Sequence, residues 1–168
     1  MANGNADNSN HLTAYIAGIT DAHFNFVSKI SKDSARKVGY KFQFELKYNT
    51  EIKEVSDLIQ KFLSDMGLEP RVRYRNKKKY DAYQIIIGRV DDIDVYLSEL
   101  LPYMSARKAA AELLINSIFP KIRDKQHSTK EGFVEIAGLV DEFRKEAGRD
   151  NRSKYNQNYF IENWNVQL

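Results

Sequence analysis

Residues 15 to 24 are Tyr-Ile-Ala-Gly-Ile-Thr-Asp-Ala-His-Phe, and they have the pattern of a helix with small residues on one side that ends in a polar pair at the head of a strand. Helical spacing over Leu12 to Ala22 puts the small residues Ala14, Ala17 and Gly18 on one narrow side. A glycine inside a helix costs about 1 kcal/mol relative to alanine, so it usually has a packing reason. We therefore expect another backbone to approach the helix closely along this side.

The pattern after this helix changes from helical spacing to a period of two, which predicts strands. The clearest strand covers residues 40 to 48, where five apolar or aromatic positions alternate with four polar ones. One face of this strand is expected to pack on a core and the other to meet polar surroundings. The apolar positions are Tyr40, Phe42, Phe44, Leu46 and Tyr48, and the polar ones are Lys41, Gln43, Glu45 and Lys47.

Further along, Gly67 is a helix stop signal after an apolar stripe with helical spacing. A second hairpin follows, and its tyrosines, Tyr74 and Tyr83, are expected on the inner face with Tyr40 and Tyr48. The elements predicted after the first hairpin are a helix over 51–66, a hairpin over 71–87, and helices over 91–100, 106–118 and 133–147.

This order of elements predicts an α+β fold, in which an antiparallel sheet is covered by helices on one face. We expect a single domain over residues 12 to 148, a flexible N-terminal tail over 1 to 11, and a C-terminal tail over 149 to 168. Within that tail, residues 159 to 164 have the pattern of a docking helical turn, and a partly ordered tail is the alternative.

The uncovered face of the sheet carries a mixture of cations and amides. Arginine pairs bidentately with guanine, glutamine and asparagine pair with adenine, and a two-stranded ribbon fits the major groove. Residues 71 to 79 add six cations and no acid, although most charge runs are simply solvated surface. The predicted base contacts are Asn25, Gln43, Arg73, Arg75 and Gln84, and the predicted phosphate contacts are Lys29, Lys41, Lys47, Arg71, Lys77, Lys78 and Lys79.

The chain resembles the single-motif LAGLIDADG homing endonucleases over roughly residues 12 to 147. The resemblance lies in Tyr15-Ile16-Ala17-Gly18 followed by Asp21-Ala22, in the element order, and in Leu101-Pro102-Tyr103 leading into Arg107-Lys108. It implies an αββαββα fold with a saddle-shaped antiparallel sheet. It also implies a homodimer whose motif helices meet at Ala14, Ala17 and Gly18, and which cleaves a long pseudo-palindromic site in double-stranded DNA with Mg²⁺ or Mn²⁺.

The resemblance also defines the catalytic candidates, and here the sequence departs from the family. His23 occupies the position of the metal-binding acid, and Mg²⁺ prefers carboxylate oxygen over imidazole. The other candidates are Asp21, Glu45, and the basic residue Arg107 or Lys108. His23 and Glu45 together could hold Mn²⁺, Co²⁺ or Zn²⁺. The alternative is that Glu45 is neutralised by Lys41 or Lys47 as an ordinary strand neighbour.

Three functional hypotheses follow. The first is a homodimeric intron-encoded endonuclease with impaired or altered metal dependence. The second is a DNA-binding repressor or an RNA-splicing helper, a maturase, that has lost cleavage on the same fold. The third is an interaction domain for which the cations of residues 71 to 79 are only solubilising surface.

Composition narrows the remaining possibilities. The chain has no cysteine, so any metal must be bound by Asp, Glu or His. The polar opening is unlike a secretory signal, and no apolar run approaches the roughly 20 residues of a membrane span. We expect a soluble intracellular protein with no membrane partner. The net charge is +3, and His11 and His127 lie in polar segments where solvation is expected.

Overall fold

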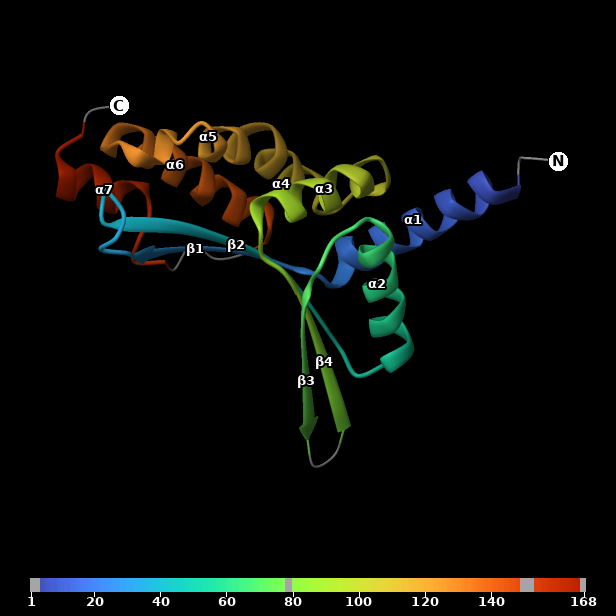
Figure 1. Cartoon of the computed structure of the whole chain (residues 1–168). Helices are drawn as coiled ribbons and strands as arrows, with labels where there is room; N and C mark the ends of the chain where they lie inside the picture. Colours follow the sequence, from blue (N-terminus) through green and yellow to red (C-terminus); the bar gives the residue numbers. More distant parts are fainter. Residues whose placement is uncertain (1–3, 78–79, 149–152, 167–168) are drawn as a thin grey trace. The chain divides into compact units, whose positions relative to one another are not determined.

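The structure is a computed structural model that describes residues 4–77, 80–148 and 153–166. Helices and strands alternate in the order predicted, with additional helices toward the C-terminus (Figure 1). The helices and strands are α1 (Gly4–His23), β1 (Asn25–Lys32), β2 (Tyr40–Thr50), α2 (Lys53–Asp65), β3 (Arg71–Lys77), β4 (Tyr80–Ile87), α3 (Val90–Leu100), η1 (Leu101–Tyr103), α4 (Lys108–Glu112), η2 (Leu113–Ile118), α5 (Phe119–Arg123), η3 (Gln126–Ser128), α6 (Lys130–Glu146) and α7 (Gln157–Trp164).

The four strands form one sheet in the order β1-β2-β4-β3. β4 pairs antiparallel with β2 on one side and with β3 on the other. The chain divides into two compact units. The first unit comprises Met1–Phe26 and Glu45–Lys108, and the second comprises Val27–Phe44 and Ala109–Leu168. These observations confirm the predicted α+β class with an antiparallel sheet.

The core of the first unit forms where the end of α1 meets α3 and the sheet. Phe24, the residue after α1, stacks on Tyr48 of β2 with ring centroids 5.1 Å apart. Tyr96 of α3 is fully buried, and its hydroxyl lies 2.7 Å from the Thr20 hydroxyl. Because Thr20 donates to the Ile16 carbonyl at 2.8 Å, the Tyr96 hydroxyl is the donor in that contact. Burial of Tyr96 raises the pKa of its hydroxyl, which keeps it protonated.

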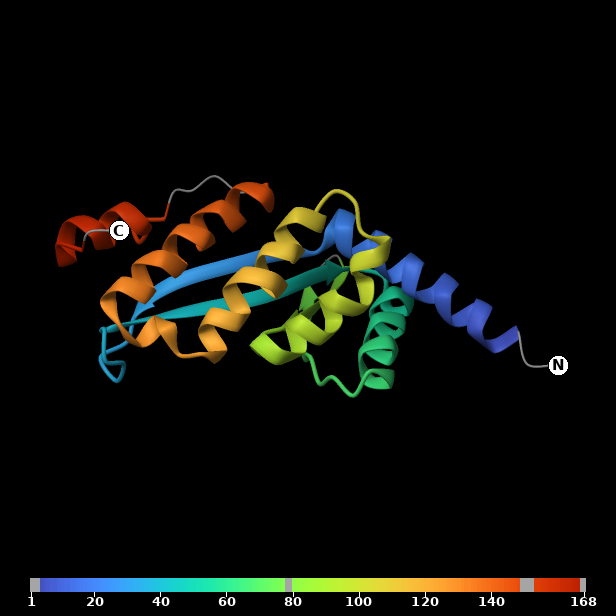
Figure 2. The same cartoon turned by 90° about the horizontal axis from the view of Figure 1, so that it is seen from above.

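The core of the second unit is an aromatic cluster between the β1–β2 hairpin and its helices. Phe42 stacks on Phe133 of α6 with ring centroids 4.2 Å apart. Tyr40 packs edge-on against Phe160 of α7 with ring centroids 5.0 Å apart. In Figure 2, α5 and α6 lie over β1 and β2. The apolar face predicted for residues 40 to 44 is therefore the face that packs, and the opposite face is left to polar side chains.

The structure corrects several boundaries. α1 begins at Gly4, before the expected Leu12. The helix predicted over 106–118 continues to Arg123 through a π-helical turn at Leu113–Ile118, which ends two residues before Pro120. Proline has no backbone N–H to donate, and Pro120 lies in the first turn of α5, where proline is tolerated.

Two further expectations have clear outcomes. Gly67 adopts the left-handed conformation that ends α2, with φ +73°, as predicted. Tyr74 was expected in the core, but it is 53% exposed, because β3 is an edge strand. Its ring centroid lies 5.3 Å from that of Tyr83 on the neighbouring strand. Within the described residues, no helix has both the length and the apolar character needed to cross a membrane.

Candidate nucleic-acid interface

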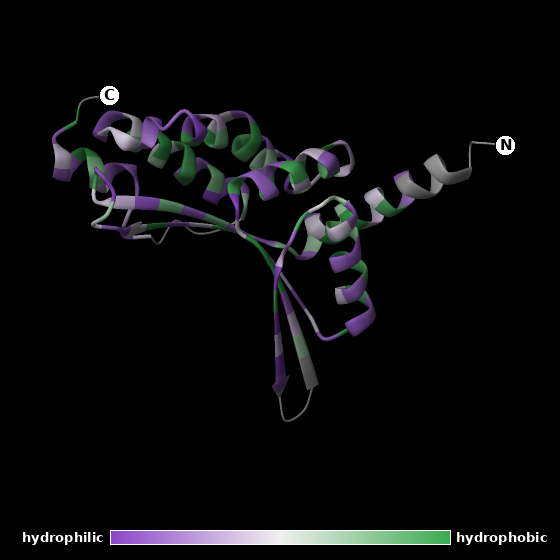
Figure 3. Cartoon of the chain, viewed as in Figure 1, coloured by the Kyte–Doolittle hydropathy of each residue, from purple (hydrophilic) through white to green (hydrophobic). Residues whose placement is uncertain are grey.

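One face of the β2–β4–β3 segment in the first unit is polar. The strand register places Gln84 of β4 opposite Asn49 of β2 on one side and opposite Arg73 of β3 on the other. The adjacent row consists of Lys47, Ile86 and Arg71. Because side chains alternate between faces, these residues share one face, and hydrophilic positions recur along β3 (Figure 3). The sheet thus collects the predicted cations and amides of this unit on a single surface.

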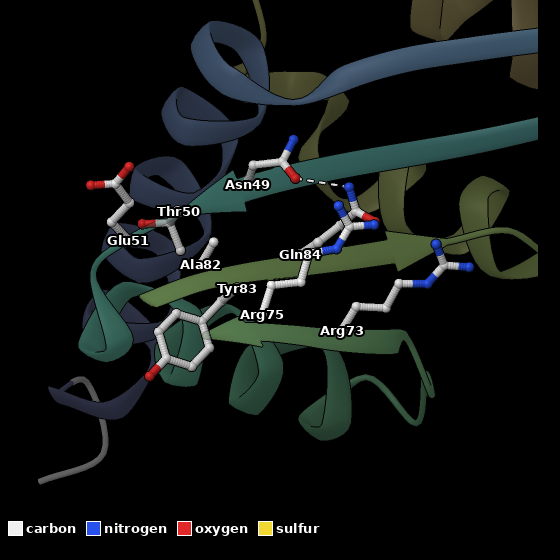
Figure 4. Close-up of a pocket in the computed structure, with 8 residues that line it drawn as sticks. All are labelled: Asn49, Thr50, Glu51, Arg73, Arg75, Ala82, Tyr83 and Gln84. Carbon is white, nitrogen blue, oxygen red and sulfur yellow. Dashed lines mark hydrogen bonds between the residues drawn. The ribbon is translucent and has the colours of Figure 1, made fainter. Parts of the chain in front are cut away.

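The outer part of this surface is hollowed (Figure 4). Arg73 and Arg75 project from β3, and all of β3 from Arg71 to Asn76 is exposed. Within the part of the chain that the structure describes, no acidic side chain forms an ion pair with Arg73 or Arg75. Their charge is thus available for an anionic partner. The hollow is lined by Asn49, Thr50, Glu51, Arg73, Arg75, Ala82, Tyr83 and Gln84.

Glu45 lies among the cations of this face. One carboxylate oxygen pairs with Lys47 Nζ at 2.6 Å and the other with Arg71 Nη2 at 2.8 Å. Burial opposes ionisation of Glu45, but the hydrogen bonds and charges of Lys47 and Arg71 outweigh it, so the pKa of Glu45 is lowered. Of the two predicted alternatives, this arrangement matches neutralisation by Lys47, with Arg71 as a second partner that the sequence did not indicate.

Asn49 belongs to this surface although it was not among the predicted contacts. Gln84 Nε2 donates to Asn49 Oδ1 at 2.8 Å. The signal that could have found Asn49 is the alternation itself, since it follows Lys47 by two positions on the same strand. The two amides lie side by side in Figure 4.

In the second unit, the polar positions of β1 and β2 lie on the face away from the aromatic cluster. Lys29 and Gln43 are exposed, and Ser31 donates to Gln43 Oε1 at 3.4 Å, so these three share that face. Lys41 pairs with Asp33 at 3.4 Å rather than with Glu45. In the first unit, Asn25 at the start of β1 is also exposed.

At the end of α1, Asp21 holds the segment that leads into α4. Its carboxylate accepts hydrogen bonds from the main-chain N–H groups of Ser105, Ala106 and Arg107 at 2.7 to 2.8 Å. The Asp21 carbonyl accepts a further bond from Arg107 Nε at 3.0 Å. The Arg107 guanidinium also lies over the Phe26 ring, 5.6 Å from its centroid. Asp21 therefore fixes both the main chain and the side chain of Arg107.

These contacts bear on metal binding. His23 is exposed at the end of α1, while both carboxylate oxygens of Asp21 and of Glu45 already have partners. The described residues contain no group of three His, Asp or Glu side chains that could hold a metal ion. Within one chain, these residues do not fit the oxygen-rich site that Mg²⁺ requires. Lys108 is the first residue of α4, next to Arg107.

The small residues of α1 differ in their exposure to solvent. Ala17 is fully buried inside the first unit, whereas Ala14 and Gly18 are exposed. A Cβ atom built at Gly18 would meet nothing within 4 Å. Packing among the residues that the structure describes therefore gives no reason for a glycine there. Of the predicted basic loop, Lys77 ends β3, and Lys78 and Lys79 lie outside the described residues.

His127 departs from the solvated position expected for it. It lies on η3 in the second unit, and its Nδ1 atom is buried without a hydrogen-bond partner among the described residues. Burial, together with the positive charge of Arg36, lowers the pKa of His127.

Known proteins resemble this chain in sequence and in fold. No protein-family model matches the chain. The chain is 25% identical over 130 residues to a probable intron-encoded endonuclease 2 of Neurospora crassa, covering 73% of this chain and 27% of that protein. The chain thus spans about a quarter of the length of that curated relative.

Solved structures cover nearly the whole chain. The homing endonuclease I-CvuI, solved with uncleaved DNA in the presence of magnesium, superposes with a TM-score of 0.78 at 19% identity, over 96% of this chain and 99% of that one. The archaeal intron-encoded homing endonuclease I-Vdi141I, complexed with DNA, superposes with a TM-score of 0.74 at 17% identity, over 95% of this chain and 99% of that one. The LAGLIDADG meganuclease I-CpaMI, bound to uncleaved DNA, superposes with a TM-score of 0.62 at 18% identity, over 85% of this chain and 54% of that one. This chain therefore has the fold of the LAGLIDADG homing endonucleases.

Proposed function

We propose that the chain is a sequence-specific double-stranded DNA-binding protein of the homing endonuclease type. The observation that carries this proposal is the polar face of β2, β4 and β3, where Arg73 and Arg75 lie beside the amides of Asn49 and Gln84. Exposed guanidinium groups bind phosphates or guanine, and amides bind adenine, so the set can both hold and read a duplex. Structures of the same fold have been solved with DNA, which supports this assignment.

The proposal includes a homodimer that reads a long pseudo-palindromic site. Exposed Ala14 and Gly18 on α1 give a second α1 helix a place to approach closely, and a Cβ atom at Gly18 would meet none of the described residues. A two-fold axis along this contact would duplicate the strand face and so match the symmetry of the DNA. The I-CvuI and I-Vdi141I chains are covered to 99%, so this chain corresponds to one copy of such a protein.

A second function, binding without cleavage as a repressor or maturase, is favoured by a specific observation. The carboxylates of Asp21 and Glu45 are engaged by N–H groups and cations, and His23 replaces the acid expected at the metal position. Imidazole supplies no negative charge to Mg²⁺. We therefore propose that cleavage with Mg²⁺ is impaired, and that the remaining activity depends on a metal that accepts nitrogen, such as Mn²⁺.

Binding and cleavage are tested separately. Duplex DNA selected from a randomised library is titrated with the protein at several salt concentrations without divalent metal, and sedimentation gives the stoichiometry. We expect affinity to fall steeply with salt, because each neutralised phosphate releases counterions, and we expect two chains per site. Salt-independent or absent binding would refute DNA recognition and favour an interaction domain.

Cleavage of the selected duplex is then measured in Mg²⁺ and in Mn²⁺, with His23→Asp alongside the parent chain. Cutting by His23→Asp in Mg²⁺, with weak or Mn²⁺-dependent cutting by the parent, is the expected result. Equal cutting by both chains in Mg²⁺ would show that His23 is no impairment. His23→Asn is the matched control, because it removes the imidazole without adding a carboxylate.

A further inference from the structure

Gln84 occupies the centre of the polar face on β4. Asn49 and Arg73 flank it on the neighbouring strands, in a row perpendicular to the strand direction. Adjacent strands lie roughly 4.8 Å apart, so the row is about 10 Å across, close to the ~12 Å width of the major groove. Next to Gln84 on the same face is Ala82, whose small side chain helps to form the hollow described above. A base edge can therefore approach Gln84.

The hydrogen bond to Asn49 determines what Gln84 can recognise. A primary amide has two N–H donors and one carbonyl acceptor. One Nε2 hydrogen of Gln84 is used by Asn49 Oδ1 at 2.8 Å, which leaves one N–H and Oε1 for a partner. This pair matches adenine, whose major-groove edge offers the N7 acceptor and the N6 donor. Guanine presents two acceptors there, so one of them would face Oε1 unfavourably.

Asn49 also reduces the cost of ordering the Gln84 side chain. A free glutamine loses substantial rotamer freedom when it binds a base, and a side chain already held by a neighbour loses less. Gln84 is half-buried and held across the sheet, whereas Asn49 is exposed at the end of β2.

We propose that Gln84 is the specificity-determining residue for one adenine in each half of the DNA site, with Asn49 as its positioning residue. This inference rests on the proposed function and deepens it, since it names the base that the central row of the sheet selects.

The test measures base preference, one position at a time, on the duplex selected by the parent chain, without divalent metal. We expect a position where adenine is preferred on the order of tenfold, and Gln84→Ala reduces this preference to about twofold or less. Gln84→Met, which keeps the length of the side chain, gives the same result if the alanine variant is unstable. Gln60→Ala is the control, because Gln60 is also a half-buried glutamine with a side-chain partner, Ser56, but lies on α2.

Two Asn49 variants distinguish positioning from general stabilisation. Asn49→Ala removes the acceptor and is expected to lower the adenine preference at the same position. Asn49→Asp keeps an acceptor oxygen, so the preference returns, while its negative charge weakens binding to all four bases alike and cancels from the ratio.

Each contrary outcome has a definite meaning. A defined site whose base preferences all survive Gln84→Ala overturns the inference and leaves DNA recognition standing. Loss of the adenine preference in Gln84→Ala but not in Asn49→Ala overturns the positioning role of Asn49. No binding by the folded parent chain, with an intact unfolding transition, overturns the proposed function itself.

Discussion

Asp21 holds Arg107 at two points: its carboxylate accepts the Arg107 main-chain N–H at 2.8 Å, and its carbonyl oxygen accepts from Arg107 Nε at 3.0 Å. The contact joins the last turn of α1 to the segment before α4. Asp21, the acidic residue of the motif that is present in this sequence, therefore uses its hydrogen bonds to hold Arg107 in place. Arg107 rather than Lys108 is the better candidate for stabilising charge on a phosphate, because its position is fixed.

Removing the Asp21 carboxylate should destabilise the chain. Asp21→Ala leaves three N–H groups without their acceptor, and hydrogen bonds to a charged group contribute about 1.5–3 kcal/mol each, with losses at one site that are not additive. We expect a loss of roughly 2–4 kcal/mol in the free energy of unfolding, measured by urea titration. Asp94→Ala is the control, since Asp94 accepts a side-chain bond from Ser98 on α3. A loss no larger than that of the control would contradict the holding role.

Arg73 should contribute to DNA binding without contributing to folding. Arg73→Ala removes an exposed guanidinium with no acidic partner among the described residues, so stability should change by less than about 0.5 kcal/mol. Affinity for the selected duplex should fall by ~1–3 kcal/mol if Arg73 contacts a base. Lys61→Ala on α2, where Lys61 pairs with Asp65, serves as the charge-matched control. Equal losses for both variants would show that only net charge matters.

Glu45 should make stability depend on pH in the acidic range. Its pKa is lowered in the folded chain, so its contribution is present above the unfolded value near 4.3 and is lost as the pH falls through the folded value. Glu45→Gln should therefore cost roughly 0.2–1 kcal/mol at pH 7 and almost nothing at the acid end. Urea titrations of both chains across this range test the prediction, and a constant difference at every pH would contradict it.

His127 should cause a second loss of stability at a higher pH. Its pKa is lowered in the folded chain, so the unfolded chain binds the proton more readily as the pH falls through about 6.5. The contribution of the neutral His127 side chain to the free energy of unfolding is fully present above about pH 6.5 and declines below that pH. Melting temperatures recorded between pH 8 and pH 5 should fall for the parent and change less for His127→Gln. His11→Gln, at an exposed position on α1, is the control.

The C-terminal helix α7 should prove to be part of the folded core. Phe160 is fully buried against Tyr40, Phe133 and Trp164, so Phe160→Ala is expected to cost about 3–5 kcal/mol. Glu162→Ala, at an exposed position of the same helix, should have little effect. Thermal unfolding followed by circular dichroism compares the two, and similar melting temperatures would show that α7 adds nothing to stability.

Local sequence patterns were sufficient to predict the order of the elements through the second hairpin and the two faces of β2. Period-two alternation gave the core side of β2, and the Gly67 signal gave the end of α2, because both are set by residues that are close along the chain. The resemblance in residues 15 to 24 pointed to the fold that the structure and the comparisons confirm. The same local information placed Arg73, Arg75 and Gln84 on one face.

Which polar groups contact one another depends on the tertiary structure. Asp21 meets Arg107 across 86 positions, Gln84 meets Asn49 across 35, and Arg71 meets Glu45 across 26. Such partners depend on strand register and helix packing, which side-chain periodicity within one segment cannot specify. For the same reason the sequence could not show that Tyr74 is exposed, since exposure depends on whether another element covers the edge strand.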